Sequence, residues 1–481
     1  MRSRSIRALS CAGTAALVCG LLTAMGTGTA DAAGSGLQGD FNGDGYRDVV
    51  TAAPFATVDG KTEAGVVAVL YGSASGLGSA RRTIISQNSA GVPGTVESSD
   101  WFGFQLATGD LNEDGFADVV TSAPLEDNTH GTNGGTVVIL WGGSGGVSGG
   151  LTVNNGAPGK TIGQALAVGD FDSNGKDIAY GGSDPYVWIA KDGFTKTQHT
   201  GQIAGAQAPV KDGCGVTGLS AGEIDNNTVD APMDDLIVTG CKNDSSGDMG
   251  NWYYEGTAGV PRNVKALPNG ESTALGDLNR DGHGDIAIGN TKDPADDATS
   301  ATGGKVTVLL GGPSGPDTTT ARSFTQDSPG IPGSSEARDA FGMEMSIGDI
   351  DGDGFGELAI GVPLENIGDA TDTGAAVVLR GSAAGPTETG IQYFTQNSTG
   401  VPGSNEDWDR FGSDILLSDL TKDGHAELIV AAHFENGGNG AMWSLPGSSA
   451  GITTSGSVSL SPSSLGISTV GTPSFAANFA G

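Results

Sequence analysis

One acidic pattern of nine residues recurs along this chain and restricts what it can fold into. The pattern reads Asp, x, Asp/Asn, x, Asp/Asn, Gly, x, x, Asp/Glu, and its first copy is Asp40–Asp48. Further copies cover 110–118, 277–285, 349–357 and 419–427, and a copy one residue shorter covers 170–177. Oxygen side chains at alternate positions, with Gly sixth, suit a loop that wraps a hard cation. We therefore predict a repeat protein whose repeats bind Ca²⁺; the alternative is that these acids form solvated turns without metal.

The loop differs from an EF-hand, which has flanking helices and a Glu at position twelve. Position twelve here is Thr51, Thr121, Ile288, Ile360 or Val430. Short apolar runs rich in β-branched residues, such as Val49–Ala53, follow the loops and predict buried strands. Each acidic loop is therefore predicted to join two strands of a hairpin.

Residues 1–32 have the features of a secretory signal peptide. Arg2, Arg4 and Arg7 are followed by an apolar stretch over 8–24 and by the small-residue site Ala30-Asp31-Ala32. The alternative is an N-terminal membrane anchor, and no other apolar run reaches the ~20 residues of a transmembrane helix. We expect a secreted protein without a transmembrane segment, and a monomer.

Composition and cysteine count add two expectations. The net charge of −33 disfavours nucleic acid as a partner, which needs a basic surface. Bound cations would offset part of that charge. In an exported chain Cys214 and Cys241 are predicted to form a disulfide within one repeat; the alternative is two free thiols.

Other elements recur in register with the acidic loop. Upstream lies Phe-Gly, at 102–103, 341–342 and 411–412, with Ile-Gly at 162–163. Downstream, a second apolar strand ends in a Gly/Ser turn, which occurs seven times. Seven units of four short strands predict an all-β fold, a seven-bladed β-propeller of four-stranded blades over 33–481. The fourth unit, over 223–235, loses the loop spacing, so no metal is expected there.

Closure of the ring is predicted from the C-terminus. Residues 475–481 resemble 102–108, a segment that precedes an acidic loop, whereas only Leu37–Gly39 precede the first loop. The last residues should therefore supply or complete the inner strand of the first blade, which also removes an exposed sheet edge.

Phe-Gly, the acidic nonapeptide and Gly/Ala-x-Pro together resemble the FG-GAP repeat of the integrin α-subunit propeller and of exported bacterial proteins, over 34–481. The resemblance implies structural Ca²⁺, four to six ions, in the hairpin loops, and adhesion through the opposite face. Thr421 departs from the pattern at the third position of the last loop, and the third loop lacks one residue. The resemblance implies the following metal ligands, with the backbone carbonyl as the ligand at the seventh position: Asp40, Asn42, Asp44, Tyr46 and Asp48; Asp110, Asn112, Asp114, Phe116 and Asp118; Asp170, Asp172, Asn174 and Asp177; Asp277, Asn279, Asp281, His283 and Asp285; Asp349, Asp351, Asp353, Phe355 and Glu357; and Asp419, Thr421, Asp423, His425 and Glu427.

No catalytic residue is predicted. The Gly-x-Ser-x-Gly stretches at 142–146 and 447–451 coincide with the Gly/Ser turns. A nucleophile elbow requires a helix after the Ser, and no helix is expected after either stretch. His130, His199 and His433 have no metal-ligand spacing.

The face opposite the acidic loops is the predicted interaction surface. Three copies of one loop lie there, over 87–94, 326–333 and 396–403. Trp101 and Trp408 follow two of them and either bind a partner or cap the core between blades. We expect an adhesion or recognition module for an extracellular protein or glycan. The alternatives are a secreted hydrolase or lyase with its site in the propeller channel, or a purely structural surface protein.

Overall fold

The structure is a computed structural model that describes residues 35–226, 233–244 and 246–481. The predicted signal peptide lies outside the described residues. The described residues belong to one compact unit. No helix among the described residues is long and apolar enough to cross a membrane.

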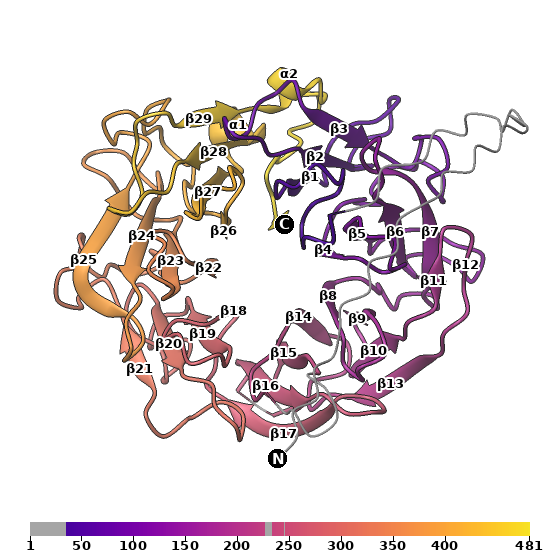
Figure 1. Cartoon of the computed structure of the whole chain (residues 1–481), viewed down its shortest axis with the longest axis horizontal. Coiled ribbons are helices and arrows are strands. Elements are labelled where there is room, and N and C mark those ends of the chain that lie inside the picture. The colour runs from indigo at the N-terminus through magenta and orange to yellow at the C-terminus, as the bar shows by residue number, and fades with distance from the viewer. Residues whose placement is uncertain (1–34, 227–232, 245) are drawn as a thin grey trace, which may run out of the picture. The chain divides into compact units, whose positions relative to one another are not determined.

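Within the described residues, seven four-stranded antiparallel sheets stand as blades around a central axis, as predicted (Figure 1). From the inner to the outer strand, blades 1 to 4 are β30 (Phe479–Ala480), β1 (Val49–Ala53), β2 (Val66–Leu70) and β3 (Arg82–Ile85); β4 (Leu106–Gly109), β5 (Asp118–Ala123), β6 (Thr136–Trp141) and β7 (Ser148–Asn155); β8 (Ala165–Gly169), β9 (Asp177–Gly181), β10 (Tyr186–Ala190) and β13 (Ile203–Gln207); and β14 (Val216–Gly222), β15 (Asp235–Cys241), β16 (Met249–Glu255) and β17 (Arg262–Leu267). Blades 5 to 7 are β18 (Ser272–Gly276), β19 (Asp285–Asn290), β20 (Lys305–Leu309) and β21 (Arg322–Phe324); β22 (Met345–Gly348), β23 (Glu357–Val362), β24 (Ala375–Arg380) and β25 (Thr387–Phe394); and β26 (Ile415–Ser418), β27 (Glu427–Ala432), β28 (Ala441–Leu445) and β29 (Val458–Leu460). Besides the blades, the described residues form a hairpin of β11 (Phe194–Thr195) and β12 (Gln198–His199) and the short helices α1 (Glu435–Gly438) and α2 (Pro462–Leu465).

The C-terminus closes the ring, which confirms the prediction made from residues 475–481. Strand β30 is the inner strand of the first blade, and its Phe479 pairs with Thr51 of β1. The resemblance to 102–108 is also structural. The Ala476 N–H donates to the Ala52 carbonyl just as the Gly103 N–H donates to Ser122. The first and last repeats are thus held together by backbone pairing.

The core is divided among the blade interfaces. One apolar cluster, for example, combines Val50 and Val67 of blade 1 with Phe102 and Val119 of blade 2. Strands with a blade on either side are buried on both faces, so β5, β6, β23 and β27 are buried along their whole length. This explains why the second strands appear in the sequence as continuous apolar runs.

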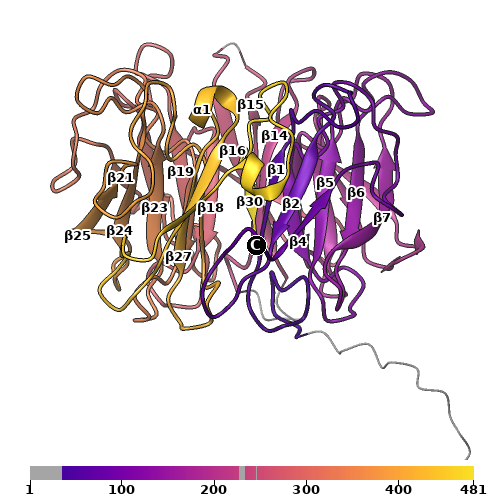
Figure 2. The same ribbon diagram turned by 90° about the horizontal axis from the view of Figure 1, so that it is seen from above.

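Strand direction separates two faces of the propeller. Since the strands within each blade alternate in direction, the inner-to-second and third-to-outer connections share one face, which we call the acidic-loop face (Figure 2). The second-to-third connections and the links between blades lie on the other, here called the opposite face. The three repeated loops at 87–94, 326–333 and 396–403 link neighbouring blades and therefore lie on the opposite face, as predicted.

The disulfide between Cys214 and Cys241 is present, with the two Cα atoms 6.0 Å apart. Cys241 ends β15, and Cys214 lies in the turn that leads into β14. The bond therefore ties the inner two strands of blade 4 together at one end, within a single repeat as predicted.

Candidate metal centre

The acidic nonapeptides join the inner strand to the second strand in blades 2, 3, 5, 6 and 7, which confirms the predicted hairpins. In blade 1 the loop leads into β1 alone, because the inner strand comes from the C-terminus. Side chains of the loop cap its own backbone: Asp40 accepts N–H bonds from Gly43 and Gly45, both at 2.7 Å. The same two-oxygen arrangement occurs at Asp349, which bonds Gly352 and Gly354.

Among the loops that keep the regular spacing, the sixth best fits a cation. Carboxylate oxygens of Asp349, Asp351 and Asp353, at its first, third and fifth positions, all lie within 4.8 Å of one another. Such an all-oxygen set is the chemistry that Ca²⁺ takes in proteins. Phe355, His283 and the other residues at the seventh position donate their backbone N–H to the fifth side chain, for example His283 to Asp281 at 2.9 Å.

The ninth residue of each loop has a second role that the sequence did not reveal. Asp118 is fully buried, and its two oxygens accept N–H bonds from Leu111, inside the loop, and from Gly142, in the Gly/Ser turn, at 3.0 and 2.8 Å. It therefore joins the acidic loop to the turn between the outer strands. The corresponding pairs of N–H donors are Phe41 and Gly72 for Asp48, Leu278 and Gly311 for Asp285, Ile350 and Gly381 for Glu357, and Ile224 and Gly256 for Asp235.

The glycine of the Gly/Ser turn is required by a close approach. A Cβ atom at Gly142 would lie 2.1 Å from the Ala117 carbonyl oxygen, and one at Gly72 would lie 2.0 Å from that of Arg47. At these two positions only Gly lets the turn come within reach of the ninth carboxylate. In the third repeat, Asp192 donates the corresponding N–H to Asp177 at 2.9 Å. Since a carboxylate oxygen has more than one acceptor site, these bonds leave room for a cation as well.

Burial shifts the acidity of the ninth residues. Desolvation raises the pKa of Asp118 to about 8 and that of Asp48 to about 7, outweighing the N–H bonds that lower it. The neighbouring acids of the same loop raise it further. Without metal, Asp48 and Asp118 therefore bind protons more readily than free carboxyl groups do, and a bound cation would favour their ionised form.

Neighbouring loops are linked to one another around the ring. The residue before the ninth position donates its N–H to the carbonyl of the first residue in the preceding loop: Ala117 to Asp40 at 3.0 Å and Ala426 to Asp349 at 2.9 Å. His425 adds a side-chain contact, with Nδ1 at 3.1 Å from the Ile350 carbonyl oxygen. Its imidazole thus contacts the neighbouring blade.

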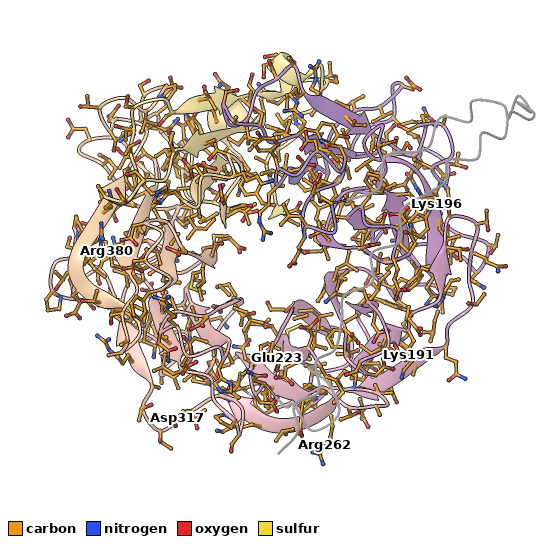
Figure 3. All side chains as sticks on the ribbon, viewed as in Figure 1. Lys191, Lys196, Glu223, Arg262, Asp317 and Arg380 are labelled. Atoms are coloured by element: carbon orange, nitrogen blue, oxygen red, sulfur yellow. A yellow bond between two sulfur atoms is a disulfide. The ribbon has the colours of Figure 1, made fainter. Side chains whose placement is uncertain are left out.

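Basic side chains contact several of the predicted ligands. Figure 3 labels two of these basic residues, Lys196 and Arg380. Lys196 lies 2.9 Å from Asp114, and Arg380 lies 2.5 Å from Asp351; Arg81 pairs with Asp44. The Lys196 and Arg81 side chains are about half exposed and the Arg380 side chain about one-third exposed, so these arms can move aside at little cost.

The shortened third loop fits a metal poorly. Its Asp172 side chain is only 2% exposed. Lys191, the residue that follows β10, places its Nζ 2.6 Å from the Asp172 carboxylate, and the Lys191 side chain is 17% exposed. A buried ammonium in this position repels a second cation. We therefore expect Lys191 to serve as the cation of this loop.

The degenerate fourth repeat keeps more of the site than its spacing indicated. Carboxylate oxygens of Glu223, Asp225 and Asp235 lie within 4.8 Å of one another, and Glu223 accepts the Gly284 N–H as a first-position residue does. The insertion therefore separates the third and ninth positions in sequence while the fold brings them together. An alignment that allows a gap inside the loop would have found Asp235.

The remaining sequence candidates are placed as follows. Both Gly-x-Ser-x-Gly stretches are turns, and β7 follows the first. Trp101 packs against Phe104 and Phe55, with ring centroids 5.7 and 5.4 Å away, which fits the capping role. Trp408 is 54% exposed and does not cap the core.

Comparison with known proteins agrees with this architecture. The model of the FG-GAP repeat matches residues 32–70, 102–140, 269–309 and 341–379. Phosphatidylinositol-glycan-specific phospholipase D of Mus musculus is 32% identical over 103 residues, 21% of this chain and 12% of that protein. The Rattus norvegicus protein of the same name is 30% identical over 140 residues, 28% of this chain and 16% of that protein. Integrin alpha-PS5 of Drosophila melanogaster is 32% identical over 113 residues, 23% of this chain and 10% of that protein.

The chain thus spans only 10 to 16% of the length of these relatives. Among solved structures, a GH74 xyloglucanase from Xanthomonas campestris aligns at a TM-score of 0.44 and 12% identity, over 79% of this chain and 50% of that one. The sequence matches and the seven blades agree on one conclusion: the chain is a seven-bladed β-propeller that carries FG-GAP repeats in four places and is weakly similar to integrin α.

Proposed function

We propose that this protein is a secreted, Ca²⁺-stabilised propeller that acts as an adhesion or extracellular recognition module. Ca²⁺ is structural in this proposal and occupies the regular loops at 40–48, 110–118, 277–285 and 349–357. The convergent carboxylates of the sixth loop support it. The disulfide supports an oxidising, extracellular location.

The observation that carries the recognition role is the aromatic surface on the opposite face of blade 7. Trp408 is 54% exposed, and Phe434, in the connection after β27, is also exposed. Arg410 stacks over the Phe434 ring, with its guanidinium carbon 4.2 Å from the centroid. Trp and Arg are among the residues that most often dominate binding to a protein partner, and Trp also stacks on sugars. Arg410 itself is half-buried.

The test is binding of the purified protein to a panel of immobilised polysaccharides and extracellular-matrix proteins in Ca²⁺. The variant Trp408→Ala/Phe434→Ala should bind its partner at least about tenfold more weakly. Tyr186→Ala, an exposed aromatic in blade 3, is the matched control and should bind as the unmodified protein does. Equal binding by all three proteins, or no binding to any surface, would contradict the proposal.

One observation favours the alternative of a hydrolase or lyase. Glu344 and Asp414 directly precede the inner strands β22 and β26 of neighbouring blades. Burial, and then the nearby Glu344 charge, raise the pKa of Asp414. Glycoside hydrolysis uses a pair of carboxyl groups, one of them kept protonated. Release of reducing ends from the same polysaccharides, abolished in Glu344→Gln, would establish this activity; no release would exclude it for those substrates.

A further inference from the structure

Three blade interfaces on the opposite face share one polar cluster, which we call the Gln–Glu–Asp cluster. Its Gln begins the repeated loop after an outer strand, its Glu follows the second strand of the next blade, and its Asp lies two residues before the Phe-Gly motif or its equivalent. In each copy the Gln and the Glu are 39 residues apart. The three clusters are Gln87, Asp100 and Glu126; Gln326, Asp339 and Glu365; and Gln396, Asp409 and Glu435.

The contacts within the cluster repeat closely. The Gln Nε2 donates to Glu Oε2 at 2.7 Å in the first cluster, 2.6 Å in the second and 2.7 Å in the third. The Asp Oδ2 accepts the backbone N–H of the Glu three residues earlier, at 2.8, 2.6 and 2.8 Å. In the third cluster the Asp409 and Glu435 carboxyl groups also hydrogen-bond to each other. In the first two clusters the carboxyl groups lie close enough that, besides burial, the charge of Asp100 raises the pKa of Glu126 and that of Glu365 raises the pKa of Asp339. Two carboxyl groups and one amide therefore gather at each interface.

These groups are buried, apart from the half-buried Glu435, and basic side chains compensate them little: Lys61 acts on Asp100 only at a distance. Asp100, Asp339 and Asp409 are at most 2% exposed, and none of the six acids forms an ion pair within the described part of the chain. A buried carboxylate without compensation is costly, by several kcal/mol as an order of magnitude. The cluster must hold either a proton or a cation.

The amide oxygen distinguishes these two possibilities. Oε1 of Gln87, Gln326 and Gln396 is buried and has no hydrogen-bond partner among the described residues, and these three side chains belong to residues that are 4%, 2% and 1% exposed. A proton shared between the two carboxyl groups leaves this oxygen unsatisfied. A cation is satisfied by all three groups at once, since amide and carboxylate oxygens are both hard ligands.

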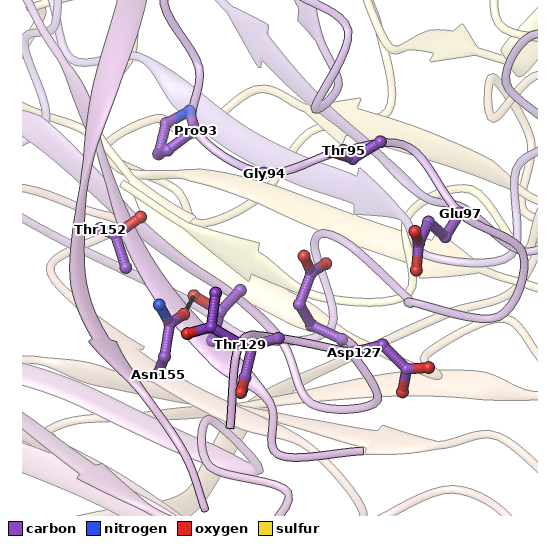
Figure 4. Close-up of a pocket in the computed structure, with 11 residues that line it drawn as sticks. Pro93, Gly94, Thr95, Glu97, Asp127, Thr129, Thr152 and Asn155 are labelled. Carbon is purple, nitrogen blue, oxygen red and sulfur yellow. Dashed lines mark hydrogen bonds between the residues drawn. The ribbon is translucent and has the colours of Figure 1, made fainter. Parts of the chain in front are cut away.

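We propose that each Gln–Glu–Asp cluster binds a hard divalent cation of the Ca²⁺ type through the Gln Oε1, Glu and Asp oxygens. The ion would join the repeated loop of one blade to the second strand of the next, at the interfaces of blades 1 and 2, 5 and 6, and 6 and 7. At the first interface a pocket of about 430 Å³ adjoins the cluster and gives it a path to solvent. Glu97 and Asp127 lie at one end of this pocket, and Thr152 and Asn155 at the other (Figure 4).

These sites are separate from the acidic nonapeptides, so they can be tested separately. The first measurement is the number of Ca²⁺ ions bound by the purified protein, by equilibrium dialysis at millimolar free Ca²⁺. The variant Glu126→Gln/Glu365→Gln/Glu435→Gln keeps the side-chain volume and an oxygen for the Gln Nε2. It should bind three fewer ions. The control Asp296→Asn/Asp369→Asn/Glu388→Gln removes the same charge from exposed positions and should lose none.

A second variant set separates this proposal from Ca²⁺ binding by the nonapeptides. Replacing the fifth residue of the four regular loops, in Asp44→Asn/Asp114→Asn/Asp281→Asn/Asp353→Asn, should remove ions from the acidic-loop face alone. Loss of ions only in this set would overturn the cluster proposal while leaving the loops intact. Loss only in the Gln–Glu–Asp set would support the clusters and refute the loops.

The sites can also be located directly in the unmodified protein. Crystals soaked in Tb³⁺ should show anomalous peaks about 2.3–2.6 Å from the oxygens of the three clusters. Peaks confined to the acidic-loop face would mean that the clusters hold protons, and the proposal would then be wrong.

Discussion

Removal of the Asp118 carboxylate tests whether the ninth residue holds the blade together independently of metal. In Asp118→Ala the N–H groups of Leu111 and Gly142 both lose their acceptor, at a position that is fully buried. The substitution should therefore destabilise the protein in EDTA as well as in Ca²⁺.

The expected loss of stability follows from the two N–H groups that are left without an acceptor. An unsatisfied buried polar group costs about 1–3 kcal/mol, so two of them cost about 2–6 kcal/mol. Asp114, in the same loop, is the matched control. Its side chain is 30% exposed, and it accepts one N–H bond and pairs with the exposed Lys196. Asp114→Ala should therefore cost at most about 1 kcal/mol in EDTA.

Thermal unfolding of the unmodified protein and both variants, each in EDTA and in millimolar Ca²⁺, provides the assay. Asp118→Ala should lower the melting temperature by at least about 4 °C in both conditions, given roughly 2 °C per kcal/mol for a large domain. Asp114→Ala should lower it mainly in Ca²⁺, where a ligand is lost. If the two variants lose equal stability in EDTA, the structural role of the ninth residue is refuted.

Three further predictions concern pH, Lys191 and ring closure. In EDTA the melting temperature should fall as pH rises from about 4 to 8. The folded-state pKa values of Asp48 and Asp118, about 7 and about 8, exceed the unfolded value, so the folded protein binds more protons than the unfolded chain in this pH range. A flat profile would contradict this. Lys191→Met leaves Asp172 buried without its ammonium partner, so it should destabilise the EDTA-treated protein more than Lys196→Met, which removes a lysine whose side chain is 53% exposed. Millimolar Ca²⁺ should restore part of the stability lost in Lys191→Met. Equal losses in the two variants would refute the role of Lys191. Deletion of 475–481 removes β30 and the buried Phe475, so the melting temperature should fall markedly; an unchanged value would show that the ring does not depend on this strand.

The sequence predicted the architecture because the repeats place the same elements in register. Phe102, Phe341 and Phe411 are all fully buried, and the C-terminal Phe475 takes the same position, which is why residues 475–481 could be recognised as an inner strand. The disulfide followed from an even pair of cysteines. These features are local in sequence or repeat at regular intervals, so they can be recognised from a single amino-acid sequence.

The sequence could not predict contacts between residues that the fold brings together. The bond from Gly142 to Asp118 spans 24 residues, and that from Gln87 to Glu126 spans 39. Lys191 reaches Asp172 because β10 pairs with β9, which fixes the position of a lysine that has no motif of its own. Asp235 was missed because an insertion hides its place in the pattern.

Ca²⁺ binding by the acidic nonapeptides is the central claim, and one comparison tests it most directly. The unmodified protein and Asp44→Asn/Asp114→Asn/Asp281→Asn/Asp353→Asn are melted in EDTA and in millimolar Ca²⁺. Each Asn keeps the oxygen that accepts the N–H bond of the seventh residue and loses only the charge. Ca²⁺ should raise the melting temperature of the unmodified protein strongly and that of the variant much less. No Ca²⁺ effect on the unmodified protein, or an equal rise in the variant, would show that these loops are ordinary turns.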